Sequence, residues 1–272
     1  MSKESLVSII MATYNQGIYI KKAVESASSQ TYKNKEIIVV DDGSTDNTKK
    51  VLLPFIKDKK IKYIYQENSG SALARNKAID NAQGEYIAIL DADDIWIDRD
   101  KLKKQIEFLE KNNEYILVGG GMIIVDINGR EIKKCLPPET DAEIRKSILI
   151  RNPFVHSAVV FKREIWQLTN GYIGRKKVST DEWSLWLELG KLGKFYNFPE
   201  YFIYYLKNPQ GTSKKKQVYN LREDIKIRKK YRTYYPNFWK GYFYGWLQYF
   251  YFFFPFKKQL YPIISGLKRI IF

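Results

Sequence analysis

YIAILDADD, residues 86–94, joins an apolar run to three carboxylates, and the interpretation of the whole chain depends on this stretch. Its first five residues predict a buried β-strand, which ends where Asp91, Asp93 and Asp94 follow. Because like charges repel and ionised groups resist leaving water, acids clustered at the end of a buried strand indicate a bound cation. A divalent metal (Mg²⁺ or Mn²⁺), held by one or two carboxylates and by substrate phosphates, suits them. A turn or a helix cap would also explain Asp93 or Asp94 at this point.

Strand and helix signals alternate through the first hundred residues. Strands are predicted at 6–11, 36–40, 61–65 and 86–90, and helices at 18–29 and 70–81, with another ending near residue 55. This alternation is typical of an α/β fold, a parallel sheet covered by helices, in which ligands bind beyond the carboxyl ends of the strands. Polar clusters follow three of these strands: Thr13, Tyr14 and Asn15; Asp41 and Asp42; Asp91, Asp93 and Asp94. We therefore expect one ligand site at this edge of the sheet.

The polar clusters do not match the common phosphate-binding loops. The first predicted strand is followed by neither a Gly-x-Gly-x-x-Gly pattern nor a Gly-Lys-Ser/Thr loop, so dinucleotide and P-loop functions lose their main support. The ring of Tyr14 could stack on a base, and the carboxylate of Asp42 could accept a hydrogen bond from a base N–H. Arg75 carries a fork of donors that suits phosphate oxygens. These residue types point to a nucleotide ligand.

Four segments carry a resemblance to a known family. They are VSIIMATYN (7–15), EIIVVDDGSTD (36–46), NSGSALARN (68–76) and the GEY to LDADD segment (84–94). In this order and spacing the chain resembles the family 2 glycosyltransferases of the GT-A fold, inverting enzymes that use nucleotide-sugar donors. The resemblance covers most of residues 6–96. It implies a Rossmann-like mixed sheet flanked by helices, and a bacterial surface-polysaccharide type of function.

The resemblance also implies roles for individual residues. Asp91 and Asp93 form the metal-binding Asp-x-Asp motif, with Asp93 nearest the ion. Tyr14 and Asp42, together with their neighbours Thr13 and Asn15, belong to the nucleotide-sugar site, where the base is usually uracil. Arg75 lies near the donor, and Asp91 contributes to donor binding as well.

The second half of the chain contains the only histidine, His156. Segments 116–127 and 131–136 predict a hairpin around Asn128-Gly129, and segment 155–161 predicts a strand that includes His156. A lone histidine in a strand is most often structural. Because the resembled family often has a histidine near this point, His156 could equally contact the acceptor or a phosphate.

Asp181 and Glu182 are the candidates for a catalytic base. They precede a helical stripe of Leu185, Trp186 and Leu189, where carboxylates are also favoured by the helix dipole. The resembled family has a Glu-Asp pair here, with Asp as the base, whereas this chain has the two residues in reverse order. Position favours Glu182 and residue type favours Asp181; we assign the base to Glu182 and keep Asp181 as the alternative.

The basic charge is concentrated in the last part of the chain. Residues 214–272 contain 14 Lys and Arg against two acids, and segment 236–255 is unusually aromatic. We therefore predict a GT-A domain at 1–213 and a helical, basic and aromatic region at 214–272. Its apolar stretch is shorter than a spanning helix of about 20 residues, so an interfacial anchor on anionic lipid is the preferred interpretation. A surface that stacks on nucleic acid is disfavoured because no such motif is present, and a packed helical pair or a dimer contact stays open.

Cysteine usage and the first residues predict the compartment. The single Cys135 excludes an intramolecular disulfide framework, and the first five residues lack the pattern of a signal peptide. We expect a cytoplasmic protein that associates peripherally with the inner face of the cell membrane.

Taken with these observations, the family resemblance implies an inverting, metal-assisted glycosyltransferase. It would move a sugar from a nucleoside diphosphate donor, a UDP-sugar, to a hydroxyl of a glycan or of a lipid-linked acceptor. A sugar-phosphate nucleotidyltransferase is the alternative enzyme, although the Gly-rich loop it usually needs is absent. A non-catalytic protein that binds nucleotide sugars or membranes is the alternative outside enzymology.

Overall fold

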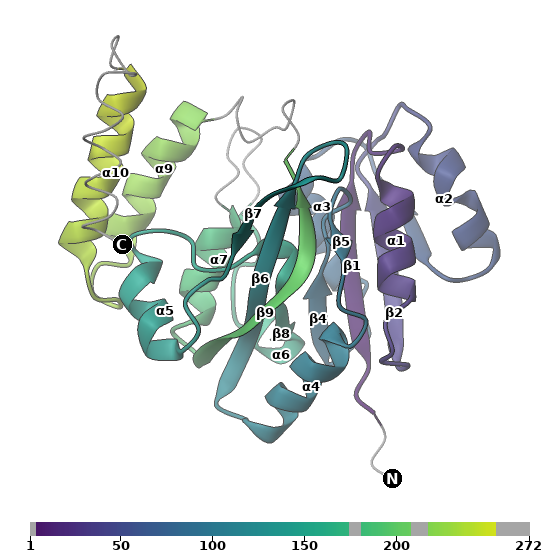
Figure 1. Ribbon diagram of the computed structural model, residues 1–272, viewed down its shortest axis with the longest axis horizontal. Helices are drawn as coiled ribbons and strands as arrows, with labels where there is room; N and C mark the ends of the chain where they lie inside the picture. Colours follow the sequence, from purple (N-terminus) through teal and green to yellow (C-terminus); the bar gives the residue numbers. More distant parts are fainter. Residues whose placement is uncertain (1–3, 174–180, 208–216, 254–272) are drawn as a thin grey trace.

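The computed structural model describes residues 4–173, 181–207 and 217–253 (Figure 1). The strands are β1 (Val7–Thr13), β2 (Lys35–Asp41), β3 (Lys62–Tyr65), β4 (Tyr86–Ile89), β5 (Ile95–Trp96), β6 (Tyr115–Val125), β7 (Glu131–Cys135), β8 (Val160–Lys162) and β9 (Lys194–Leu206). The helices are α1 (Ile20–Ser28), α2 (Thr48–Lys57), α3 (Ser71–Asp80), α4 (Lys101–Lys111), α5 (Asp141–Ile148), the 3₁₀ helix η1 (His156–Ala158), α6 (Arg163–Trp166), α7 (Asp181–Leu189), α9 (Gln217–Lys230) and α10 (Phe238–Phe253).

One mixed sheet organises the described part of the chain. Eight of its nine strands run in the order β3-β2-β1-β4-β8-β6-β9-β5, and the ninth, β7, pairs with β6. The strands β1 to β4 are parallel, and β8 adds to β4 in the antiparallel direction. The predicted α/β fold is therefore confirmed, and β4, the strand that precedes the three acids, lies in the middle of the sheet.

The central strands are hydrophobic on both faces, which explains their nearly continuous apolar sequence. Alternate residues of β1 pack into two different cores, as parallel sheets covered on both sides require: Ile9 lies in one and Ile10 in the other. The helices α1, α2 and α4 cover one face, and α3, α5 and α7 cover the other. The two layers of helices leave the ends of the strands as the place for a site.

The second half adds the strands that close the sheet. The predicted hairpin is present as β6 and β7, and β9 runs parallel to β6 for most of its length. The strand predicted at 155–161 was wrong for its first part: His156 belongs to η1, and the strand β8 begins only at Val160. A tight turn is formed here because the side chains of His156 and Ser157 bond to acids at the end of β4.

Helices α9 and α10 lie side by side at one end of the molecule (Figure 1). They belong to the region predicted at 214–272, of which the structure describes 217–253. Both helices also contact the rest of the protein: Tyr235, between them, donates its hydroxyl to the carbonyl of Leu187 in α7 at 2.7 Å. The backbone of α10 approaches the end of α5 so closely that a Cβ on Gly241 would lie 2.1 Å from the Leu149 carbonyl oxygen. Across the described ranges, the helices fall short of the length and apolarity that crossing a bilayer requires.

The packing of the segment before β4 against β1 leaves no room for a side chain at Gly84. A Cβ there would lie 2.6 Å from the Ser8 backbone nitrogen and 2.7 Å from the Leu6 carbonyl oxygen. Overpacking of this kind costs roughly 1–3 kcal/mol, so we expect Gly84→Ala to lower the free energy of unfolding by about that amount in urea denaturation. The neighbouring exposed variant Gln83→Ala should stay within about 0.5 kcal/mol of the wild type. Equal stability of the two variants would contradict this close approach.

Candidate functional site

Three polar loops meet at the carboxyl edge of the parallel strands. Thr13 and Asp41 are register partners at the ends of β1 and β2, and the backbone N–H of Asp42 donates to the carbonyl of Thr13 at 2.8 Å. Beyond β4, the N–H of Leu90 still donates to Ile10 of β1, so the acids that follow leave the sheet at the same edge. The expected convergence of the loops is confirmed.

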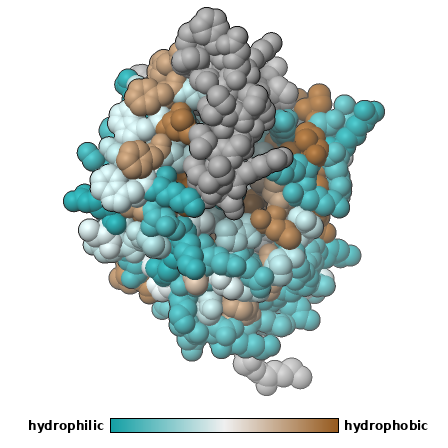
Figure 2. All heavy atoms as spheres, turned by 60° about the vertical axis from the view of Figure 1, so that its left-hand side comes forward, coloured by the Kyte–Doolittle hydropathy of each residue, from teal (hydrophilic) through white to brown (hydrophobic). Residues whose placement is uncertain are grey.

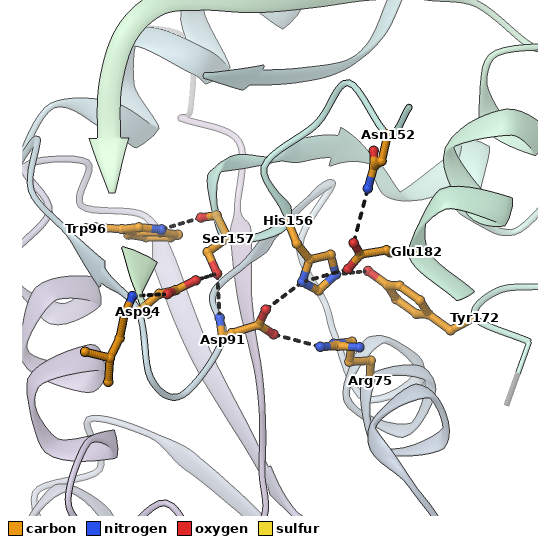
Figure 3. A network of polar contacts seen from close by, with 10 residues as sticks. Arg75, Asp91, Asp94, Trp96, Asn152, His156, Ser157, Tyr172 and Glu182 are labelled. Carbon is orange, nitrogen blue, oxygen red and sulfur yellow. Dashed lines mark hydrogen bonds and ion pairs between the residues drawn. The ribbon is translucent and has the colours of Figure 1, made fainter. Parts of the chain in front are cut away.

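Asp91 is held by two cationic or potentially cationic groups (Figure 3). Nη2 of Arg75 donates to its Oδ1 at 2.8 Å, and Nδ1 of His156 lies 2.9 Å from its Oδ2. Burial alone would raise the pKa of Asp91, but the charges and hydrogen bonds of His156 and Arg75 hold it well below its usual range. Asp91 is therefore an ionised carboxylate with both oxygens engaged.

His156 connects this carboxylate to the second half of the chain. An ionised carboxylate only accepts, so Nδ1 of His156 carries the hydrogen that faces Asp91. The other ring nitrogen, Nε2, lies 3.0 Å from the hydroxyl of Tyr172, which can donate to it when the ring is neutral. Tyr172 is itself fixed by α3, because its backbone N–H donates to the side-chain oxygen of Asn76 at 3.0 Å. The imidazole is thus oriented from both sides.

Glu182, at the start of α7, faces the same histidine. Its Oε2 lies 3.8 Å from Nδ1 of His156, and its Oε1 accepts a hydrogen bond from the side-chain amide of Asn152 at 3.1 Å (Figure 3). The alternative base, Asp181, begins the same helix, but its side chain lies outside the described residues. Glu182, one of the two predicted candidates for the base, is therefore connected to Asp91 through the ring of His156.

The other two acids of the motif have different surroundings. Asp94 is buried and accepts from the hydroxyl of Ser157, which in turn accepts from the backbone N–H of Asp91 at 3.1 Å. Burial and the charges of Asp91 and Asp93 raise the pKa of Asp94 well above its usual value. Asp94 therefore neither caps the next helix nor faces solvent; it ties the loop to η1.

Asp93 is the acid that could hold a cation. Burial and the charge of Asp91 raise its pKa to about 6, and Arg75, the cation whose charge reaches it, bonds to Asp91 instead. At neutral pH this carboxyl group is mostly ionised beside the charge of Asp91, and a bound cation would relieve the repulsion between the two. Nowhere in the described ranges do three or more His, Cys, Asp or Glu side chains gather as a metal site.

The loop after β1 contains one residue suited to stacking and one that builds the loop. The ring of Tyr14 is 47% exposed. Asn15, with a positive φ of 53°, accepts at its side-chain oxygen from the N–H groups of Thr45 at 2.8 Å and Asp46 at 3.3 Å, so it joins the first loop to the second. Thr13 is buried, and its hydroxyl makes no hydrogen bond to the described part of the chain. An unsatisfied buried hydroxyl of this kind favours a polar ligand nearby.

Asp42 organises the segment that leads into α3. Its Oδ1 accepts from the side-chain amide of Gln66 at 2.7 Å and from the N–H of Ser69 at 2.8 Å, and its Oδ2 accepts from the N–H of Gly70 at 2.8 Å. The predicted contact between Asp42 and a base would have to use a remaining lone pair. That contact, like the other ligand roles, stays a prediction.

Sequence reasoning missed three members of the network: Asn152, Ser157 and Tyr172. Ser157 could have been suspected from its place beside His156. Asn152 and Tyr172 carry no local signal, because each acquires its role only when the fold brings it to Glu182 or to His156. The arrangement as a whole offers an anionic edge that can take a cation at Asp93 and a separate carboxylate, Glu182, that can take a proton.

A family model and sequence relatives match the chain. The model described as "Glycosyl transferase family 2" matches residues 8–167. An uncharacterised glycosyltransferase of Methanocaldococcus jannaschii is 32% identical over 257 residues, which are 90% of this chain and 87% of that protein. The putative teichuronic acid biosynthesis glycosyltransferase TuaG of Bacillus subtilis is 44% identical over 124 residues, 44% of this chain and 49% of that protein. An uncharacterised glycosyltransferase of Rickettsia conorii is 34% identical over 199 residues, 71% of this chain, and the match spans only 32% of that protein.

Solved structures match the fold at lower sequence identity. TarS 1–349 of S. aureus in complex with UDP-GlcNAc has a TM-score of 0.66 and 20% identity, over 82% of this chain and 66% of that chain. The mannosyltransferase PcManGT from Pyrobaculum calidifontis, in complex with GDP-Man and Mn²⁺, has a TM-score of 0.65 and 18% identity, over 92% of this chain and 71% of that chain. These likenesses confirm the predicted GT-A type of fold.

The pair formed by Arg75 and Asp91 should show energetic coupling. Arg75→Met leaves the half-buried carboxylate with one cationic partner fewer, so we expect a loss of roughly 1–3 kcal/mol in the free energy of unfolding. Adding Asp91→Asn to this variant should recover part of the loss, because the uncompensated charge is removed. Lys60→Met, which breaks an exposed pair with Asp58, serves as the control and should change stability by less than about 1 kcal/mol. Losses from Arg75→Met and Asp91→Asn that simply add would argue against the pair.

Proposed function

The chain belongs to glycosyltransferase family 2, and from that premise we propose that it transfers a sugar from a UDP-sugar to a hydroxyl of a glycan or lipid-linked acceptor, with inversion at the anomeric carbon. The observation that carries the proposal is the position of Glu182. A carboxylate from α7 lies 3.8 Å from His156, whose ring bonds to Asp91 at the end of β4. The proton acceptor and the acids of the donor side therefore share one network.

The proposed reaction is a single displacement. The acceptor hydroxyl gives its proton to the carboxylate of Glu182 as its oxygen forms a bond to the anomeric carbon. The bond from that carbon to the diphosphate oxygen breaks at the same time, and the nucleoside diphosphate leaves. Asn152 orients Glu182 through the 3.1 Å hydrogen bond to Oε1. Attack from the face opposite the leaving group inverts the anomeric carbon.

Asp93 would hold the divalent metal, Mn²⁺ or Mg²⁺. The raised pKa of its carboxyl group and the engagement of both Asp91 oxygens favour Asp93 over Asp91 as the direct ligand. When bound, such an ion would neutralise charge on the diphosphate. In this assignment Asp91 acts through its neighbours: it fixes Arg75 and His156 at the edge where the donor phosphates would lie.

The nucleotide would occupy the edge formed by the loops after β1 and β2. Tyr14 offers an exposed ring for the base, and the buried hydroxyl of Thr13 needs a polar partner. The choice of UDP is supported by the structurally similar TarS, which was solved with UDP-GlcNAc, while PcManGT was solved with GDP-Man and Mn²⁺. The family match gives no support to the alternative enzyme, a sugar-phosphate nucleotidyltransferase. A network that joins acids to a proton acceptor also has no evident use in a non-catalytic protein that only binds nucleotide sugars or membranes.

The exposed aromatic side chains of α10 support a lipid-linked acceptor and association with the inner face of the cell membrane. Four of them, Trp239, Phe243, Phe250 and Phe253, are between 56% and 65% exposed and recur at helical spacing. Figure 2 turns this flank forward and shows hydrophobic side chains at its upper left, among pale and hydrophilic ones. The same two helices also carry exposed basic residues, Arg222 and Lys229 in α9 and Lys240 in α10, which suits an interface with anionic lipid. The relative TuaG is named for teichuronic acid biosynthesis, which agrees with a glycan or lipid-linked acceptor.

Turnover should depend on Glu182, on Asp93 and on a divalent metal. We expect UDP release from one of a panel of UDP-sugars in MnCl₂ or MgCl₂, and loss of that activity in EDTA. Glu182→Gln should lower kcat by about 10²–10⁴-fold, the usual contribution of a general base. Asp93→Asn should raise the metal concentration needed for half-maximal rate. Glu107→Gln, on the exposed side of α4, is the matched control and should leave kcat unchanged.

Each outcome of this experiment has a separate meaning. If Asp181→Asn lowers kcat more than Glu182→Gln does, the base assignment is wrong and the donor assignment stands. If GDP-sugars alone are turned over, the choice of UDP is wrong. Full activity in EDTA would refute the metal at Asp93.

Binding to anionic membranes should depend on the exposed rings of α10. We expect sedimentation with vesicles that contain phosphatidylglycerol, and weaker sedimentation at high salt. Because burying one large apolar side chain is worth about 1.5–3 kcal/mol, the double variant Phe243→Ser/Phe250→Ser should lower the partition coefficient at least about tenfold. Ile127→Ser, an equally exposed apolar position in the β6–β7 turn, is the control. Equal loss in the control, or none in the double variant, would overturn the assignment of α10 as the anchor.

A further inference from the structure

Arg228, in α9, lies where α5, α7, α9 and α10 meet, and it is only 2% exposed. A buried guanidinium is costly unless its donors are satisfied, and apolar residues of similar volume often replace buried charges without loss of stability. Its third nitrogen, Nη1, makes no hydrogen bond to the described residues. Burial lowers the pKa of Arg228, and the charge of Asp224, four residues earlier in α9, acts to raise it, so this carboxyl group offsets part of the cost.

The contacts of Arg228 point in two directions. Its Nε donates to the carbonyl of Leu149 at 2.9 Å and its Nη2 to the carbonyl of Ile150 at 3.0 Å, directly after the end of α5, where carbonyls lack helical partners. Its guanidinium also lies over the ring of Trp183 in α7, with 4.7 Å between the carbon and the ring centroid, a cation–π contact. One side chain thus holds the end of α5 and the start of α7.

Both contacts are made with segments that position Glu182. Trp183 is the next residue in α7, and its indole N–H donates to the carbonyl of Ile148 at 2.8 Å. Asn152, two residues beyond Ile150, donates to Oε1 of Glu182. Arg228 therefore fixes the segments that supply both partners of this hydrogen bond.

The neighbouring contacts make α9 and α10 a continuous support for α7. Lys230 and Tyr231 both bond to Glu188, one helical turn or more beyond Glu182. The close packing of α10 extends to Arg228 itself, because a Cβ on Gly245 would lie 3.1 Å from its Nη1. The guanidinium is thereby confined on the side that faces α10.

We infer that Arg228 is a positioning residue for the proposed catalytic base Glu182, so that a helix from the C-terminal region sets the geometry of proton transfer. The inference rests on the proposed function for the role of Glu182. Arg228 touches no substrate and acts through Asn152 and Trp183. Its loss should impair the chemical step and leave binding of the nucleotide, which we place at the loops after β1 and β2, unchanged.

The test compares Arg228→Met, Arg228→Lys and Lys226→Met with the wild type. Arg228→Met keeps most of the side-chain volume but loses the donors, so we expect kcat for UDP release to fall at least tenfold. The Kd for UDP with MnCl₂, measured by calorimetry, should change less than twofold. Arg228→Lys keeps the charge but lacks the fork that reaches two carbonyls, and it should recover only part of kcat. Lys226→Met, on the exposed side of the same helix, should match the wild type.

Hydrogen exchange gives a second readout that does not need turnover. We expect amides in segments 149–152 and 182–187 to exchange at least tenfold faster in Arg228→Met than in Lys226→Met, with no change in β1. A kcat for Arg228→Met within twofold of the wild type, or unchanged exchange in both segments, would overturn the inference. Equal changes in kcat and in UDP binding would also overturn it, since they indicate general destabilisation. A wild type that releases no UDP from any sugar would refute the proposed function, while the exchange comparison would still decide whether Arg228 holds the two segments.

Discussion

Repulsion among three carboxylates at the end of β4 is the constraint on which the site depends. The fold meets it separately for each acid: Asp91 is paired with Arg75 and His156, Asp94 takes a hydrogen bond from Ser157, and Asp93, whose pKa is raised to about 6, is the proposed metal ligand. Arg75 comes from α3, whereas His156 and Ser157 both come from η1, so the acids can be accommodated only when α3 and η1 are in place. The bonds that the acids make therefore fix the positions of the neighbouring loops.

His156 connects the two parts of the site that we propose to bind the donor and the acceptor. The ring contacts Asp91 at 2.9 Å, faces Glu182 at 3.8 Å and meets the Tyr172 hydroxyl at 3.0 Å. These groups come from the end of β4, from α7 and from the segment before it. A displacement of any of them would change the position of the ring. The imidazole is thus a geometric link between the two carboxylates, whatever contact it makes with a substrate.

The first half of the fold could be predicted from sequence because its information is local. Apolar, β-branched runs such as 36–40 favour strands through their local sequence. Because the carboxyl ends of parallel strands lie at the same edge of a sheet, Thr13, Asp42 and Asp91 then come together. The η1 turn could not be predicted, since its shape depends on Asp91 and Asp94, more than 60 residues away in the chain. The role of Arg228 was equally hidden: among neighbouring lysines it resembles a solvent-exposed charge, and only its distant partner Leu149 makes it a buried one.

The contact between Gly241 and the Leu149 carbonyl has a practical consequence for handling this protein. Because the α10 backbone rests directly on the end of α5, the last helices cannot be treated as a detachable tail. Shortening the chain to obtain a better-behaved sample would open the hydrophobic side of α7 to water and invite aggregation. A soluble crystallisation variant would be better made by exchanging the outward rings of α10 for polar side chains while the helix stays in place.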